Sequence, residues 1–251
     1  MSKDLSRQNL SGANLQNANL MTVNLIRTNL SNANLIGANL TGANMAQADL
    51  RNANLNEVNL KIANLAECNC QNVNMTKANL TGANLYMANL EYANLSGSDL
   101  TGANLFWAML KGANLTEITW KIKDLTKFGF PGGLSETNLS GVDLSNTQGV
   151  CLDLEDSILV KTNLFWANLG AAHLSRADLT EANLQYANLS LADLIDVKLS
   201  GANLQYADLT GANLTGVKYG KANFKNAKYN ENTQFPKRFN PENKGMILVK
   251  D

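Results

Sequence analysis

Hydrophobic residues recur along the chain with a period of five, which fits neither regular secondary structure. From Thr76 to Leu105 the sequence reads TKANL TGANL YMANL EYANL SGSDL TGANL, so one five-residue phrase occurs six times. Leucines five residues apart would scatter around an α-helix, and they would alternate between the two faces of a flat strand. The pattern therefore predicts a chain that turns once in every five residues.

Each phrase has three positions that we name by their residues. Leucine occupies the centre position, alanine or serine the small position two residues earlier, and asparagine or aspartate the amide position between them. If a phrase is a short extended piece followed by a corner, the centre and small positions point to the same side and line one interior. The amide position and the two residues after each centre then face solvent.

The residues expected at the corners are typical turn formers. Asparagine and aspartate side chains hydrogen-bond to nearby backbone, and glycine adopts the turn conformations that other residues resist. Asparagine dominates the amide positions, and glycine often precedes the small position, as at Gly82, Gly102 and Gly211. We expect these residues to have a structural role.

A long uninterrupted tandem of A-(N/D)-L-x-x closely resembles the pentapeptide-repeat proteins. The resemblance implies an all-β, right-handed, quadrilateral parallel β-helix in which four pentapeptides form one coil of about twenty residues. The centre positions fall on multiples of five from Leu5 to Leu125, and one residue earlier in each five from Leu134 to Tyr229. At four phrases a coil, they predict about 11 coils stacked as a single domain.

The regular pattern is interrupted between about residues 116 and 162. Trp120 occupies a centre position, and Phe130 is followed by Pro131 and two glycines. Proline cannot donate to a β-ladder and Gly-Gly favours a bend, so we expect a bulge or loop at 127–133. The change of phase is equally consistent with one deleted residue or four inserted residues.

The two ends of the repeat region differ. We predict a β-helix over residues 1–229 and a capping segment over 230–251, whose Phe235, Phe239 and residues 246–249 are apolar enough to cover the last coil. A solenoid end needs such a cover because it exposes leucines and unpaired strand edges. The amino end shows no comparable segment. This suggests a head-to-head homodimer that buries the first coil around Leu5, Leu10 and Leu15, or a short cap.

Composition argues against several functions. Lysine plus arginine and aspartate plus glutamate number 21 each, so no overall charge attracts nucleic acid or anionic membrane. No signal core or apolar run of about 18 residues is present, so we expect no membrane span and a cytoplasmic location.

Cys68 and Cys70 occupy the small and centre positions of one phrase, where we expect reduced core thiols. The single histidine, His173, lies at an outward amide position, and we expect neither metal nor cofactor.

Catalytic motifs are absent from the sequence. It contains no phosphate-binding loop, paired-cysteine motif or nucleophile elbow, and one histidine leaves little scope for imidazole acid–base chemistry. The cluster Asp153, Glu155 and Asp156 is the one candidate for a carboxylate-based β-helix enzyme, and a solvated charged face explains it more simply. We therefore expect no enzyme and no small-molecule substrate.

The resemblance also raises one specific alternative. Some pentapeptide-repeat proteins resemble duplex DNA in shape and charge and bind DNA gyrase. Those members are strongly acidic and favour phenylalanine at the centre position, whereas this chain is neutral and favours leucine. A neutral solenoid lacks the phosphate-like charge that dominates DNA recognition, which argues against DNA mimicry.

Aromatic residues form an outward stripe. Trp166, Tyr186 and Tyr206 each lie two residues after a centre and are spaced by one predicted coil, so they should stack about 4.8 Å apart. Met87 and Trp107 form a similar pair, with Tyr86 and Phe106 beside them. Such a ladder stabilises its own stack, but contiguous exposed aromatic residues also mark interaction sites. The sequence thus predicts a scaffold for an undefined protein partner, with these candidate docking residues: Met87, Phe106, Trp107, Trp166, Tyr186 and Tyr206.

Overall fold

The computed structural model describes residues 3–119, 125 and 133–250. They belong to two compact units. Unit 1 comprises Met1–Lys121 and Lys127–Gly133, and unit 2 comprises Ile122–Thr126 and Leu134–Asp251. Trp120 and nearly all of the bulge or loop expected at 127–133 lie outside the described residues. We describe each unit by itself.

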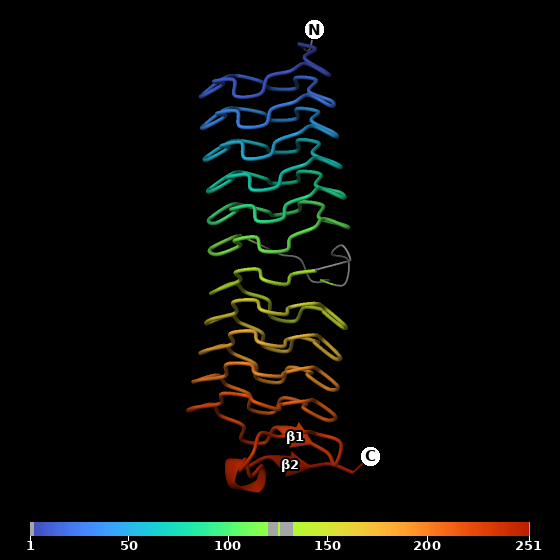
Figure 1. Cartoon of the computed structure of the whole chain (residues 1–251), viewed down its shortest axis with the longest axis vertical. Helices are drawn as coiled ribbons and strands as arrows, with labels where there is room; N and C mark the ends of the chain where they lie inside the picture. The colour runs from blue at the N-terminus through green and yellow to red at the C-terminus, as the bar shows by residue number, and fades with distance from the viewer. Residues whose placement is uncertain (1–2, 120–124, 126–132, 251) are drawn as a thin grey trace. The chain divides into compact units, whose positions relative to one another are not determined.

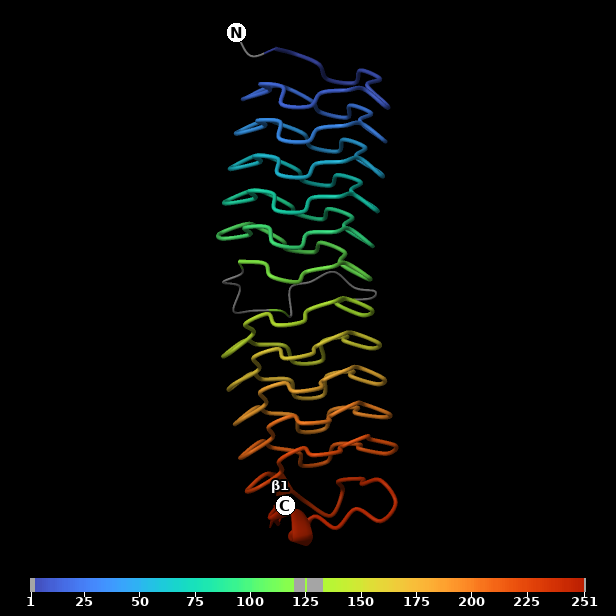
Figure 2. The same ribbon diagram turned by 90° about the vertical axis from the view of Figure 1, so that its left-hand side faces the viewer.

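Both units are stacks of coils whose repeat is twenty residues. In unit 1, parallel single-residue bridges join amide positions from Asp4↔Asn24 to Asp99↔Thr119, and in unit 2 from Asn138↔Ile158 to Asp208↔Lys228. Figures 1 and 2 show successive coils lying one above another within each unit. Residues twenty apart are vertical neighbours, as the repeat predicted.

The predicted interior column is confirmed in unit 1. The Leu30 N–H donates to the Asp49 carbonyl at 2.7 Å, and the Leu50 N–H donates to the Asn69 carbonyl at the same distance. Leu30, Leu50, Cys70 and Leu90 are completely buried in this column, whereas Leu10, in the first coil, is half-buried. Each coil has one centre position on each of its four sides, and these positions point inward. Because most of them hold leucine, leucine side chains fill the interior.

In the described part of the chain, helices and strands of two or more residues occur at the carboxyl end. They are the strand β1 (Lys228–Tyr229), the 3-10 helix η1 (Glu242–Lys244) and the strand β2 (Ile247–Leu248). The two strands pair in parallel, with Lys228 opposite Ile247 and Tyr229 opposite Leu248. Elsewhere a turn follows each bridge, so the chain is extended for too few residues to form longer strands.

Every corner is a tight turn with one residue in the left-handed conformation. The Ala13 N–H donates to the Leu10 carbonyl at 3.0 Å, and the same bond from a small position to the preceding centre recurs at nearly every described corner. The residue before the small position has positive φ at every fifth position from Arg7 to Glu117 and from Glu136 to Gly216. Positive φ at the third turn residue is typical of a type II turn. The glycines predicted for corners, such as Gly82 (φ +65°), meet this requirement without steric cost.

The asparagine side chains hold both the corners and the stack. The Asn64 Oδ1 accepts from the Ala66 N–H at 3.2 Å and from the Asn84 Nδ2 at 3.0 Å. The Asn64 Nδ2 in turn donates to the Asn44 Oδ1 at 3.1 Å. One amide thus closes its own turn and joins its coil to the coils before and after it, which confirms the structural role expected from the sequence.

Ile62 is, with Thr22, one of two β-branched residues with left-handed φ among the described corners. It has φ +53° and its side chain is 62% exposed, and a β-branched residue is strained in this conformation. We expect Ile62→Asn to raise the free energy of unfolding by about 1 kcal/mol, because asparagine tolerates left-handed φ. Chemical denaturation should show no comparable gain for Ile62→Val, which keeps the branch. Equal stability of the two variants would contradict this explanation.

Ser98 is an exception to the alanine-lined core. Its side chain is buried at a small position, and its Oγ has no hydrogen-bond partner among the described residues. At other small positions a buried hydroxyl does find one, since the Thr28 Oγ1 donates to the Leu5 carbonyl at 2.8 Å. Burying an unpaired hydroxyl is unfavourable.

We therefore expect Ser98→Ala, which restores the alanine of the repeat, to stabilise unit 1 by about 1–2 kcal/mol. Thr28→Ala is the matched control and should destabilise, because it removes a hydroxyl that is hydrogen-bonded. Thermal and denaturant unfolding of the two variants measure the difference. A destabilised Ser98→Ala protein would show that the hydroxyl has a partner in solution.

The predicted thiol arrangement is confirmed. Cys68 and Cys70 are buried free cysteines, and the Cys68 Sγ donates to the Met45 carbonyl at 2.8 Å. The neighbouring Cys68 thiol, together with complete burial, holds the pKa of the Cys70 thiol well above its usual range. A thiol with a raised pKa is a poor nucleophile, so Cys70 acts as a core residue. Cys68 is buried beside it.

The carboxyl-terminal segment covers the last coil through aromatic residues. Phe239 stacks on Phe235 with ring centroids 4.9 Å apart, and its edge contacts Phe224 and Tyr219 at 5.3 and 5.1 Å. Met246 is buried. The expectation that residues 246–249 all cover the coil is only partly correct, because Ile247 and Leu248 are exposed. These two residues form β2, which adds a further rung beside β1.

The register of Leu125 bears on the change of phase. From Leu134 to Leu209 in unit 2, each centre N–H donates to the carbonyl 19 residues ahead, as from Leu134 to Asp153. The buried Leu125 donates instead to Gln148, 23 residues ahead, at 2.7 Å. Leu125 therefore occupies the place that the unit 2 register gives to residue 129. This bond favours four inserted residues over one deleted residue.

Candidate functional site

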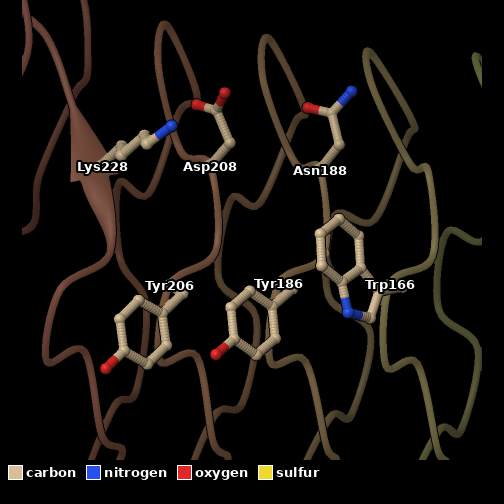
Figure 3. Close-up of a pocket in the computed structure, with 7 residues that line it drawn as sticks. Trp166, Tyr186, Asn188, Tyr206, Asp208 and Lys228 are labelled. Carbon is tan, nitrogen blue, oxygen red and sulfur yellow. The ribbon is translucent and has the colours of Figure 1, made fainter.

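Three aromatic side chains form a continuous ladder on one corner of unit 2. Trp166 stacks on Tyr186 with ring centroids 5.0 Å apart and an interplanar angle of 5°, and Tyr186 stacks on Tyr206 at 4.9 Å and 4°. The side chains are 55%, 37% and 44% exposed, respectively. Figure 3 shows the three rings in one row along the stack. The spacing predicted from the strand separation is confirmed, and we call this feature the aromatic ladder.

The backbone fixes the position of each rung. The Trp166 N–H donates to the Gln185 carbonyl and the Tyr186 N–H to the Gln205 carbonyl, both at 3.0 Å. All three ladder residues have left-handed φ, between 56° and 62°. Because successive corners repeat one conformation, successive rings point in one direction. The ladder is thus held by the coils, and no rearrangement is needed to present it to a ligand.

Phe165 closes one side of the ladder. Its ring packs edge-on against Trp166 with centroids 6.3 Å apart, and against Tyr186 at 5.6 Å. Edge-to-face contacts between aromatic rings are favourable. Phe165 therefore supports two rungs from the first position of the same corner. The sequence contained a signal for this residue, since the phrase LFWA places it directly before Trp166.

A groove runs beside the ladder. It has a volume of about 310 Å³ and is lined by the three rings, Ala187 and a second row formed by Asn188, Asp208 and Lys228. Figure 3 shows this row parallel to the rings. The rows are parallel because Asn188, Asp208 and Lys228 are amide positions one coil apart, as the bridges Asn188↔Asp208 and Asp208↔Lys228 show.

The three residues of the polar row carry three different chemical groups. The Asn188 Nδ2 donates to the Asn168 Oδ1 at 2.8 Å, and the Asp208 Oδ1 accepts from the Thr210 N–H and Oγ1 at 3.0 and 2.8 Å. The ammonium group of Lys228 extends from an exposed side chain. A ligand in the groove would therefore meet apolar ring edges on one side, and amide, carboxylate and ammonium groups on the other. This row was not predicted from the sequence, although the twenty-residue spacing of its members is a signal for it.

The second aromatic group lies on unit 1. Tyr86 stacks on Phe106 with centroids 6.1 Å apart and planes 9° apart, and Phe106 contacts the edge of Trp107 at 5.7 Å. Met87, one coil before Trp107, is exposed like the three rings. The predicted grouping of these four residues is confirmed. This group belongs to unit 1 and the aromatic ladder to unit 2, so each is described by itself.

The carboxylate cluster is arranged as a surface ion pair. The Arg176 Nη2 lies 2.7 Å from both the Glu155 Oε1 and the Asp156 Oδ2. The hydrogen bond from Arg176 lowers the pKa of Asp156, whereas a general acid at neutral pH needs a raised pKa. The Asp153 Oδ1 accepts from the Glu155 N–H at 3.0 Å and closes a turn. Each of these contacts matches the simpler interpretation of the cluster as a solvated charged face.

Among the described residues, no group of three or more histidine, cysteine, aspartate or glutamate side chains is placed to hold a metal ion. Within that same part of the chain, no helix has both the length and the apolar character of a membrane span.

Comparison with known families identifies the class of protein. The family model for pentapeptide repeats matches in 8 copies, over residues 3–25, 28–65, 59–96, 78–116, 157–194 and 192–228. These segments include most of the chain, so the protein belongs to the pentapeptide-repeat family. The family fold is a right-handed quadrilateral β-helix, in agreement with the twenty-residue coils of both units.

Solved structures of similar proteins include several cyanobacterial members. HetL from Nostoc sp. strain PCC 7120, a protein involved in heterocyst differentiation regulation, is 29% identical over 89% of this chain and 86% of its own, with a TM-score of 0.38. Rfr23 from Cyanothece 51142 is 26% identical over 64% of this chain and 90% of its own, with a TM-score of 0.25.

Other comparisons are more distant. Full-length QnrB1, a plasmid-mediated fluoroquinolone resistance protein, is 14% identical over 99% of this chain and 92% of its own, with a TM-score of 0.19. Among curated proteins none matches the sequence.

Proposed function

We propose that this protein is a non-catalytic scaffold that binds a protein partner through the aromatic ladder of unit 2. The observation that carries the proposal is the ladder itself, three parallel rings that remain exposed beside a groove. Tyrosine and tryptophan are enriched among residues that dominate binding energy at protein interfaces. They present large, rigid contact areas at little cost in conformational entropy.

The fold does not require aromatic residues at this corner. An equivalent corner of unit 1 carries a polar ladder, in which the Arg27 Nε donates to the Gln47 Oε1 at 2.6 Å and the Gln47 Nε2 to the Glu67 Oε2 at 2.8 Å. Polar side chains therefore satisfy the same corner geometry without exposing apolar area. Contiguous exposed apolar area is typical of interaction sites, which favours docking over a purely structural ladder.

The surface chemistry disfavours the DNA-mimic alternative. The regular feature of this protein's surface is a column of carboxamides, such as Asn44, Asn64 and Asn84. Their side chains donate hydrogen bonds to one another. DNA presents a regular array of negative phosphates, whereas carboxamides carry no net charge. A topoisomerase that recognises duplex DNA would find little of that charge on these faces.

We include the unit 1 group of Tyr86, Met87, Phe106 and Trp107 as a second proposed contact. It resembles the ladder in having a stacked ring pair and exposed side chains. The aromatic ladder is the primary site because its three rings stack on one another without a break.

The proposal is tested by removing the rings without disturbing the corners. Asn146 and Asn226 occupy the same corner column with φ of 56° and 62°, so Trp166→Asn, Tyr186→Asn and Tyr206→Asn together should preserve the turns. The immobilised full chain and this triple variant are compared for proteins captured from an extract of the source organism. Tyr92→Asn, which removes an exposed unit 1 ring at the same turn position, is the control. Equal capture by the triple variant would refute docking on the ladder.

We also propose a head-to-head homodimer through the first coil. Leu5, Leu10 and Leu15 are half-buried there, whereas Leu25 and Leu30 are completely buried one coil later. Burial of the three leucines in a dimer would favour association. Sedimentation velocity should therefore show a dimer, and Leu10→Ser should shift it to monomer. A wild-type chain that remains monomeric at high concentration would rule the dimer out.

A further inference from the structure

The even balance of charge over the chain hides a strongly basic segment. Residues 216–251 contain eight of the 21 basic residues but three of the 21 acidic ones, so this segment has a net charge of +5 and the remainder −5. The basic residues are Lys218, Lys221, Lys225, Lys228, Lys237, Arg238, Lys244 and Lys250. The total charge of the chain does not show this asymmetry, because the two parts cancel.

Among the residues that the structure describes, no ion pair neutralises a charge of this segment. Between residues that the structure describes, ion pairs join Asp49 to Arg51, Lys161 to Glu181, Arg176 to its two acidic partners, and Lys198 to Asp178, and none involves residues 216–250. Lys244 lies instead over the Tyr219 ring, with its Nζ 5.0 Å from the centroid. Exposed cations without counterions produce a positive potential that attracts negative partners.

Two of these lysines lie at the end of the aromatic ladder. The Tyr206 N–H donates to the Lys225 carbonyl at 3.3 Å, so Lys225 belongs to the next coil on the same corner. Lys228 lines the groove beside Asp208 (Figure 3). Both lysine side chains are exposed. The ladder and its groove therefore lead directly into a positively charged coil.

We propose that the segment which docks on the aromatic ladder is an acidic polypeptide, whose carboxylates meet Lys225 and Lys228 and whose apolar side chains lie against the ring edges. This inference rests on the proposed function and names the chemistry of the partner. Electrostatic complementarity of this kind directs association and selects among partners. Asp208 offsets part of the charge in the groove, and the two lysines leave the local sum positive.

The stacking of the rings favours a polypeptide over a single-stranded nucleic acid. Proteins that bind single strands offer free aromatic faces on which bases stack. Here both faces of the Tyr186 ring are covered by Trp166 and Tyr206, which lie nearly parallel to it at 5.0 and 4.9 Å. Ring edges and tyrosine hydroxyls remain exposed, and these suit aliphatic side chains and peptide carbonyls.

The experiment measures binding of the full chain to three labelled probes by fluorescence anisotropy. The probes are a random copolymer of glutamate and tyrosine, a random copolymer of lysine and tyrosine, and oligo(dT). A random copolymer presents many local sequences, so binding does not depend on one arrangement. Lys225→Glu with Lys228→Glu reverses charge beside the ladder. Lys218→Glu with Lys221→Glu makes the same change of charge elsewhere in this basic region and is the matched control.

We expect the acidic copolymer to bind most tightly, and added salt to weaken it. Reversal at Lys225 and Lys228 should weaken this binding about tenfold or more, and reversal at Lys218 and Lys221 by no more than about twofold to threefold. Tighter binding of the lysine copolymer or of oligo(dT), absence of acidic-copolymer binding, or equal effects of the two reversals would overturn the inference. Its failure is distinguishable from failure of the proposed function, which is decided by whether the triple asparagine variant still captures the cellular partner.

Discussion

Replacing Leu50 with alanine should lower the free energy of unfolding of unit 1 by about 3 kcal/mol. Leu50 is completely buried in a column of leucines and Cys70, and the coils above and below are fixed by backbone bonds to the same column. The structure can therefore relax little around the cavity, which adds to the lost transfer free energy. Denaturant titration followed by circular dichroism measures the change.

Leu10→Ala is the matched control for this prediction. Leu10 lies in the same column but in the first coil, where its side chain is half-buried. In a monomer its removal should lower the free energy of unfolding by about 1 kcal/mol. Equal losses at the two positions would contradict the description of Leu10 as an uncovered member of the column. A loss at Leu10 that grows with protein concentration would indicate that a second copy covers it.

The triple asparagine variant of the aromatic ladder should separate binding from stability. Loss of the stacked pairs should lower the free energy of unfolding of unit 2 by about 1–3 kcal/mol. Loss of three anchors at an interface should weaken binding of the captured partner by about 100-fold or more, since each such residue contributes on the order of 2 kcal/mol. Binding is measured by calorimetry with the purified partner.

Two measurements make this prediction specific, one on the triple variant and one on the Tyr92→Asn control. Circular dichroism should retain the wild-type spectrum, because the left-handed corner is preserved by a residue that tolerates it. Tyr92→Asn should bind the partner as tightly as the wild type does. A variant that unfolds, or a partner that binds both variants equally, would show that the rings stabilise the coils and do not form the docking site.

The fold could be predicted because its determinants are local and repeated. A five-residue period fixes where the chain turns, and every phrase carries its own leucine, small residue and amide. Leu30 and Leu50 stack as predicted, since twenty residues separate equivalent corners of neighbouring coils. The aromatic ladder could be predicted for the same reason: Trp166, Tyr186 and Tyr206 occupy equivalent corners.

What the sequence did not show depends on the surroundings of single residues. The unpaired hydroxyl of Ser98 is visible only when the atoms around it are known. Arg176 pairs with carboxylates at Glu155 and Asp156 that lie one coil away, and the groove beside the ladder arises from the depth between two rows. The exposure of Ile247 and Leu248 also differs from the expectation, because an apolar segment can extend a sheet as readily as it can cover one.

Site-specific photocrosslinking from the aromatic ladder tests the docking surface most directly. A photoreactive benzoylphenylalanine replaces Tyr186 in one chain and Tyr92 in another, and each is irradiated with the captured partner. Docking on the ladder predicts a covalent adduct from position 186 that maps to an acidic segment of the partner, and none from position 92. An adduct from position 92 in the absence of one from position 186 would contradict the account.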